Sequence, residues 1–89
     1  MTEQTAFPTR AEIIAQNVEA RRHSVMLYDI NITNYEMAIA ILDAQEALDA
    51  DETAYRARLE ELLASERRER KKEALMLSVL ETQLNPEGK

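Results

Sequence analysis

The chain of 89 residues has no cysteine, no tryptophan, a single glycine and only two prolines. The missing cysteine excludes a disulfide framework and any thiolate site. Between Pro8 and Pro86 there is neither glycine nor proline. Strands depend on tight turns, and these two residues form most of them. The sequence therefore predicts an all-α protein.

Other absences bear on location and partners. The longest apolar run is a handful of residues, whereas a membrane span needs about 20, and the N-terminus lacks the basic and then apolar pattern of a secretory signal. Seventeen acidic residues against eleven basic ones give a net charge of −6, which weakens attraction to phosphate backbones. We expect a cytoplasmic protein whose partners include neither a membrane nor a nucleic acid.

The residues that usually carry catalysis are also scarce. His23 is the only histidine. Glu19, four residues earlier, could complete half of a metal site, but the Glu-x-x-His spacing of di-iron bundles does not occur. Ser24, Ser65 and Ser78 have no histidine three or four residues away. We therefore expect no catalytic residue, no metal and no cofactor, and hence no enzyme.

The first helix is marked by a capping box and a long heptad pattern. Thr9 and Glu12 have the Thr-x-x-Glu spacing that caps a helix, so we expect the helix to begin near Arg10. The positions that share one face then recur in steps of four and three. These positions are Ile14, Val18, Arg21, Val25, Tyr28, Ile32, Tyr35, Ile39 and Leu42.

Two interpretations of this region remain open, because Asn31–Asn34 has poor helix propensity. In the first, one helix runs from about Arg10 to Leu48. In the second, it breaks near Asn31–Asn34 and the chain has three helices. A break would shift the heptad pattern, but its steps of four and three continue unchanged through this segment. We therefore prefer the continuous helix.

A second helix should follow a turn around residues 49–53. Asp51 is a suitable N-cap, and the helix would run from about Glu52 to Leu84, before Asn85 and Pro86. The predicted domain is thus one antiparallel αα-hairpin over residues 10–84. Residues 1–9 and 85–89 are expected to be tails.

Charged residues interrupt the apolar face of the second helix. Its leucines share that face with Glu66 and Glu73, which in the expected hairpin register lie opposite Tyr35 and Tyr28. Because a tyrosine hydroxyl can donate to a carboxylate, we predict a polar layer that fixes the register. The residues assigned to this layer, or alternatively to contacts with an anionic ligand, are Arg21, Arg22, Tyr28, Tyr35, Glu66 and Glu73.

The first helix carries a second apolar stripe that one partner helix cannot cover. Exposed apolar stripes of this size usually mark an interface. We therefore expect self-association into a helical bundle, a homodimer or a higher oligomer. The predicted interface residues are Leu27, Ile30, Ile41 and Leu48.

Two charged segments lie on or beside the predicted turn and second helix. The basic run Ser65–Glu73 is mixed with glutamates, contains no aromatic residue and is interpreted as a solvated helix face. Asp43, Glu46 and Asp49 recur every three residues and would form an acidic edge for a partner.

The sequence thus favours a non-enzymatic structural or interaction protein, a helical-hairpin homo-oligomer that binds another protein in addition to itself. It would act as an adaptor, an assembly factor or an inhibitor of another macromolecule. One alternative is a small oligomeric binder of an anionic ligand, such as a nucleotide, at a subunit junction. Another is an acidic nucleic-acid-mimicking inhibitor of the kind found among phage accessory proteins.

Overall fold

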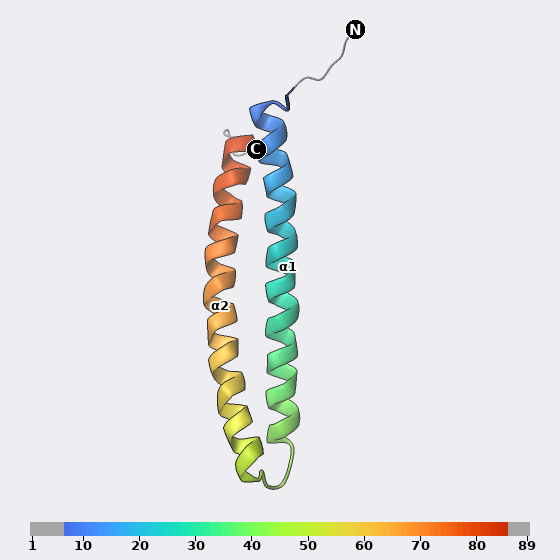
Figure 1. Ribbon diagram of the computed structural model, residues 1–89, viewed down its shortest axis with the longest axis vertical. Coiled ribbons are helices and arrows are strands. Elements are labelled where there is room, and N and C mark those ends of the chain that lie inside the picture. Colours follow the sequence, from blue (N-terminus) through green and yellow to red (C-terminus); the bar gives the residue numbers. More distant parts are fainter. Residues whose placement is uncertain (1–6, 86–89) are drawn as a thin grey trace.

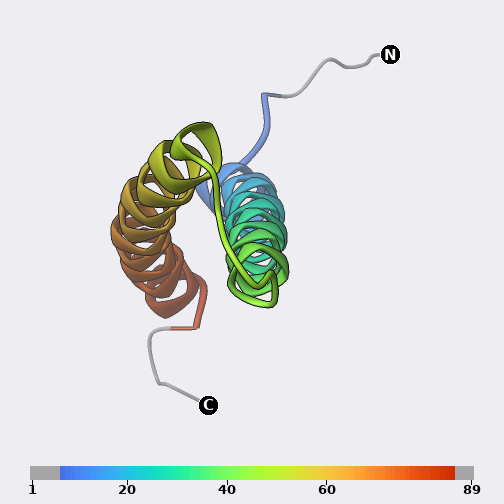
Figure 2. The same cartoon turned by 90° about the horizontal axis from the view of Figure 1, so that it is seen from below.

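The computed structural model describes residues 7–85, which form two long antiparallel helices joined by a short loop (Figure 1). Helix α1 spans Arg10–Asp43 and helix α2 spans Ala50–Leu84. Seen along the helices, the two lie side by side in a single layer (Figure 2). The start of α1 and the end of α2 therefore lie at the same end of the hairpin, called the open end below.

Helix α1 begins as its capping box predicts. The Thr9 hydroxyl accepts from the Glu12 backbone N–H at 3.1 Å, and the Glu12 carboxylate accepts from the Thr9 N–H at 2.7 Å. The helix then continues without a break through residues 31–34. Burial of the seam on both sides of this segment outweighs its weak intrinsic propensity. The continuous interpretation is confirmed.

The end of α1 and the start of α2 differ from the prediction. Helix α1 stops at Asp43 rather than Leu48, and α2 starts at Ala50 with Asp49, not Asp51, as its N-cap. Asp49 forms a second reciprocal capping box with Glu52, at 2.7 Å and 3.0 Å. This cap satisfies two backbone N–H groups at once, so it fixes the start of α2 two residues early. Residues 44–49 become the loop.

The heptad positions of α1 form one side of the interhelical seam. From Ile14 to Leu42, each of the nine positions predicted for this face is buried or half-buried. Among residues 7–85, full burial is limited to Ile14 and Val18 near the open end and to Leu59 and Leu63 of α2 toward the loop. The seam therefore has a well-packed apolar cluster toward each end.

The opposing side, on α2, is partly charged. The α2 positions that recur in steps of four and three against α1 are buried or half-buried, except for the last. Between the leucines at the two ends, the central positions are occupied by Glu66, Arg70 and Glu73. Apolar α1 residues in the middle of the seam thus face charged α2 residues. The charged α2 side chains bond to polar α1 residues at the edges of the seam. The seam positions of α2 are Glu52, Arg56, Leu59, Leu63, Glu66, Arg70, Glu73, Leu77, Leu80 and Leu84.

Candidate interaction surface

The polar residues of the central seam pair differently from the expectation. Glu73 binds the Arg21 guanidinium at 3.1 Å, and Glu66 accepts from the Asn31 amide at 3.0 Å. Tyr28 and Tyr35 are half-buried in the seam, and within residues 7–85 neither hydroxyl bonds these glutamates. The predicted Tyr–Glu pairing is therefore wrong, because Arg21 and Asn31 are the side chains placed to bond the two carboxylates.

A row of ion pairs closes one edge of the seam. Arg22, Asp29, Glu36 and Asp43 are seven residues apart, and residues with this spacing lie in one row along a helix of a two-helix seam. Each is bonded to α2. Their respective partners are Glu81, Arg70, Arg67 and Arg56. We call the broad side of the hairpin formed by these eight residues the ion-pair face.

The ion-pair face shifts the pKa of its members as expected for charged hydrogen bonds. The Arg56 guanidinium bonds both oxygens of Asp43, at 2.6 Å and 2.9 Å, and this lowers the pKa of that carboxyl. Arg22 donates to Glu81 and Arg70 donates to Asp29, and these hydrogen bonds raise the pKa values of the two arginines. Because these groups are exposed or half-exposed to solvent, each pair stabilises the fold only slightly.

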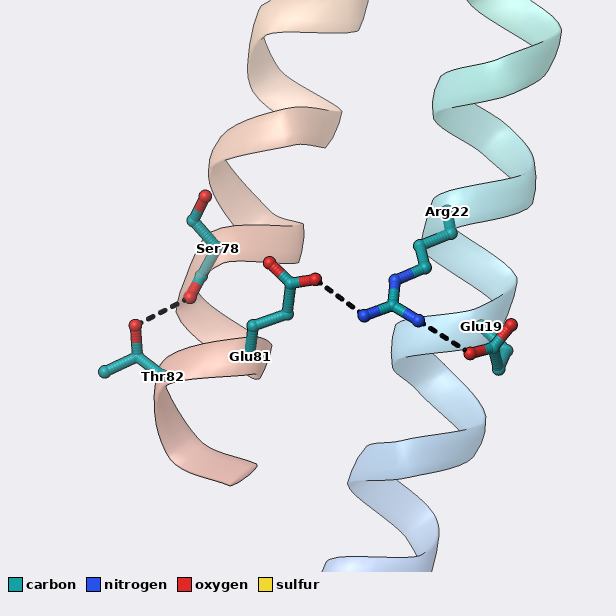
Figure 3. Close-up of polar contacts among 5 residues, drawn as sticks. All are labelled: Glu19, Arg22, Ser78, Glu81 and Thr82. Carbon is teal, nitrogen blue, oxygen red and sulfur yellow. Dashed lines mark hydrogen bonds and ion pairs between the residues drawn. The ribbon is translucent and has the colours of Figure 1, made fainter. Parts of the chain in front are cut away.

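The open end shows how the ion-pair face is built (Figure 3). The Arg22 guanidinium bridges Glu19, at 2.9 Å on its own helix, and Glu81 of α2, at 3.0 Å. Nearby, the Thr82 hydroxyl donates to the Ser78 carbonyl, a bond within α2. An open hollow of about 320 Å³ lies beside Arg22 and is lined also by Val18, Glu81 and Leu84. Both terminal nitrogens of the Arg22 guanidinium already donate to carboxylates, so an anionic ligand in this hollow would have to displace Glu19 or Glu81.

Three of the four predicted interface residues are strongly exposed. Leu27, Ile30 and Ile41 lie on α1 with 48%, 49% and 64% of their surface accessible. Leu48 is different, since it belongs to the loop and is half-buried. Its predicted place on the α1 stripe is wrong because α1 ends five residues earlier.

The side of the hairpin opposite the ion-pair face has very few charges. Its α1 rows hold no charged residue from Ile13 to Gln45 and its α2 row holds one, Glu69, while the α2 row that borders this face carries Asp51, Arg58 and Lys72. Glu69 is bonded to Lys72 at 3.1 Å, and Arg10 lies at the open end, where it bonds Gln83. We call this side the charge-poor face. Its rows are Ile13, Ala20, Leu27, Asn34 and Ile41; Asn17, Ser24, Asn31, Ala38 and Gln45; and Tyr55, Leu62, Glu69, Met76 and Gln83.

The predicted acidic edge does not form a helical row. Asp43 is the last residue of α1 and binds Arg56, whereas Asp49 caps α2. Glu46 lies in the loop and is exposed, with no ion pair among residues 7–85. The spacing of three residues would align these carboxylates only on a continuous helix, and α1 ends before it reaches the second one.

The basic run of α2 has a role that the sequence interpretation missed. Arg67 and Arg70 reach across to Glu36 and Asp29 and supply half of the ion-pair face, while Arg68 and Lys71 are left exposed or partly exposed. The signal was present in the sequence: Asp29, Glu36 and Asp43 are seven residues apart and flank the α1 seam, where a partner helix places its counter-charges.

Within residues 7–85, neither helix is long and apolar enough to cross a membrane. The same part of the chain contains no group of three His, Asp or Glu residues placed to hold a metal ion. Comparisons with protein-family models, with curated proteins and with solved structures found no match to this chain.

Proposed function

We propose that this protein is a non-enzymatic structural or interaction protein that works as a helical-hairpin homo-oligomer. In this role it serves as an adaptor, an assembly factor or an inhibitor of another macromolecule. The observation that carries the proposal is the imbalance between exposed and buried apolar side chains. Among residues 7–85, four apolar side chains are fully buried, while twelve large ones are substantially exposed.

Burial of so few side chains argues against a hairpin that works alone. A small domain stays folded only if the apolar surface that it buries offsets the chain entropy lost on folding. Chains of this size usually add disulfides, metals or association with another chain. The sequence has no cysteine, so self-association is the economical way to cover Leu27 and Ile41.

The ion-pair face supports the second half of the proposal, which is binding to another protein. This face presents acidic groups on α1 beside basic groups on α2, with the order reversed at Arg22–Glu81. Its exposed members remain accessible when another side of the hairpin is covered. Such mixed charges set specificity and association rate more than they set affinity. An oligomer that is held together by apolar contacts can therefore use this face for its partner.

The test places one charged residue in the proposed interface and measures the native mass of the protein. Ile41→Glu should convert the oligomer into single chains, because a carboxylate would be buried without a partner in the interface. Leu75→Glu is the matched control, since Leu75 has the same exposure, 63% against 64%, but lies in the α2 row that points away from the seam. Native mass spectrometry measures both variants beside the parent protein. An unchanged oligomer in Ile41→Glu, or single chains in the parent, would overturn the proposal.

A further inference from the structure

The charge-poor face has the shape and composition of half an interface. We propose that it packs against the same face of a second copy, with the two loops at opposite ends, to form an antiparallel four-helix bundle. This inference rests on the proposed function, because it names the partner and the geometry of the self-association. The ion-pair faces of both copies would then lie on the outside of the bundle.

The size of the face suits a stable dimer. A helix of 34 residues is about 51 Å long, and two adjacent helices, each about 10 Å across, are about 20 Å wide. Their shared face therefore offers roughly 1,000 Å² per copy, or about 2,000 Å² in total, which is the lower end of obligate homodimer interfaces. The helix α1 contributes two rows to this face and α2 contributes one.

The charges near the loop select the orientation. Glu46, Asp49, Asp51 and Glu52 all lie within the loop or the first turn of α2. Two copies with loops at the same end would bring two such clusters together. With loops at opposite ends, the clusters are separated by about the length of a helix, many times the ~8 Å screening length at physiological salt. The antiparallel arrangement avoids this repulsion.

The side chains of α1 are complementary to themselves in this orientation. A two-fold axis between Asn31 and Asn34 places α1 of one copy against α1 of the other, and each of these asparagines faces the other type across the axis. The Asn31 amide donates one hydrogen to Glu66, and its oxygen and second N–H can pair with the Asn34 amide of the other copy. One buried polar layer of this kind fixes register. The same axis sets the large Leu27 against the small Ala38, and Ile41 against Ser24.

The helix α2 fits the same axis. The Asn31–Glu66 and Asp29–Arg70 bonds place the axis level with residues 65 and 66 of α2. Rotation about that level sets Tyr55 of one copy against Met76 of the other, and both are exposed in the single hairpin. No two like charges of this row meet.

Disulfide cross-linking tests the arrangement, because the chain has no cysteine of its own. The variants Leu27→Cys and Ala38→Cys each introduce one thiol, and the two proteins are refolded together and oxidised. The proposed axis sets residues 27 and 38 opposite each other, within the ~7 Å that a disulfide requires between Cα atoms. Either variant alone should stay uncross-linked, since its own copies lie 11 residues, or about 16 Å, apart along the helix.

A third variant, Lys72→Cys, reports the alternative orientation. If the loops lay at the same end, α1 would pack on α2 of the other copy, and residue 27 would lie near residue 72. We expect a strong cross-link for the 27–38 mixture and none for the 27–72 mixture. An oligomer that cross-links 27 to 72, or that cross-links neither pair, overturns this geometry alone. A native mass of one chain overturns the proposed function as well.

Discussion

The two broad faces of the hairpin share one heptad frame but differ in what completes them. On the ion-pair face, Asp29, Glu36 and Asp43 find arginines on the other helix of the same chain. On the charge-poor face, the equivalent α1 row holds Asn31, Ala38 and Gln45, which offer short or uncharged side chains. The rows that flank a seam therefore decide whether a face is closed by ion pairs within its own chain or, as we propose for the charge-poor face, is left to contact another chain.

The largest expected effect comes from a charge placed on one face or the other. Ala38→Glu puts a carboxylate in the row that we propose faces the second copy, where leaving it buried and unpaired costs about 3 kcal/mol or more. The dissociation constant of the oligomer should rise more than 100-fold, as measured by analytical ultracentrifugation. Ala40→Glu makes the same substitution two residues away on the exposed side of α1 and should change this constant less than threefold. Equal effects of the two substitutions on the dissociation constant would mean that the charge-poor face is not the side of α1 that is covered in the oligomer.

A smaller effect is expected within the ion-pair face. The Asp29–Arg70 pair is half exposed, with 52% and 39% of the two side chains accessible, so water screens it. A double-mutant cycle with Asp29→Asn and Arg70→Gln should give a coupling free energy below about 1 kcal/mol, and 1 M salt should reduce it further. Urea unfolding at fixed protein concentration measures the four variants. A coupling of several kcal/mol would show that this face also stabilises the chain strongly.

The smallest effect concerns pH. Arg56 lowers the pKa of Asp43 below its ordinary value of 3.8. The resulting stabilisation is fully present above that value and is lost as the pH falls through the lower, folded-state pKa. The melting temperature of Asp43→Asn should therefore lie slightly below that of the parent at pH 7 and converge with it in acid below pH 3.8. Arg56→Gln should remove the same pH dependence. A difference that persists unchanged at the lowest pH would contradict this origin.

The sequence predicted the parts of the fold that depend on local or repeating signals. Thr9 and Glu12 mark the start of α1 because a capping box acts over four residues, and the heptad pattern predicts one helix through residues 31–34. The prediction failed at the loop, where Asp49 and Asp51 both offer a carboxylate and only the pairing with Glu52 decides between them.

The candidate surface was predictable only in part. Exposure of Leu27, Ile30 and Ile41 follows from their positions away from the seam, but the partners of Glu66 and Glu73 do not. Which side chain reaches a carboxylate depends on the exact offset and tilt of two helices. A shift of two residues at the loop changes every opposing pair, so local patterns do not determine it.

The two apolar clusters of the seam imply an order of folding. Near the loop, Asp43 and Arg56 are 13 residues apart in the chain, whereas Arg10 and Gln83 at the open end are 73 apart. Closing the shorter segment costs less chain entropy, and contacts between residues close in sequence form faster. We expect the contacts between the two helices to form first near the loop, around Leu59 and Leu63, and last around Ile14 and Val18. Because charged residues occupy the middle of the seam and divide its apolar core, we expect the two helices to separate and re-pair at the open end while they stay paired near the loop.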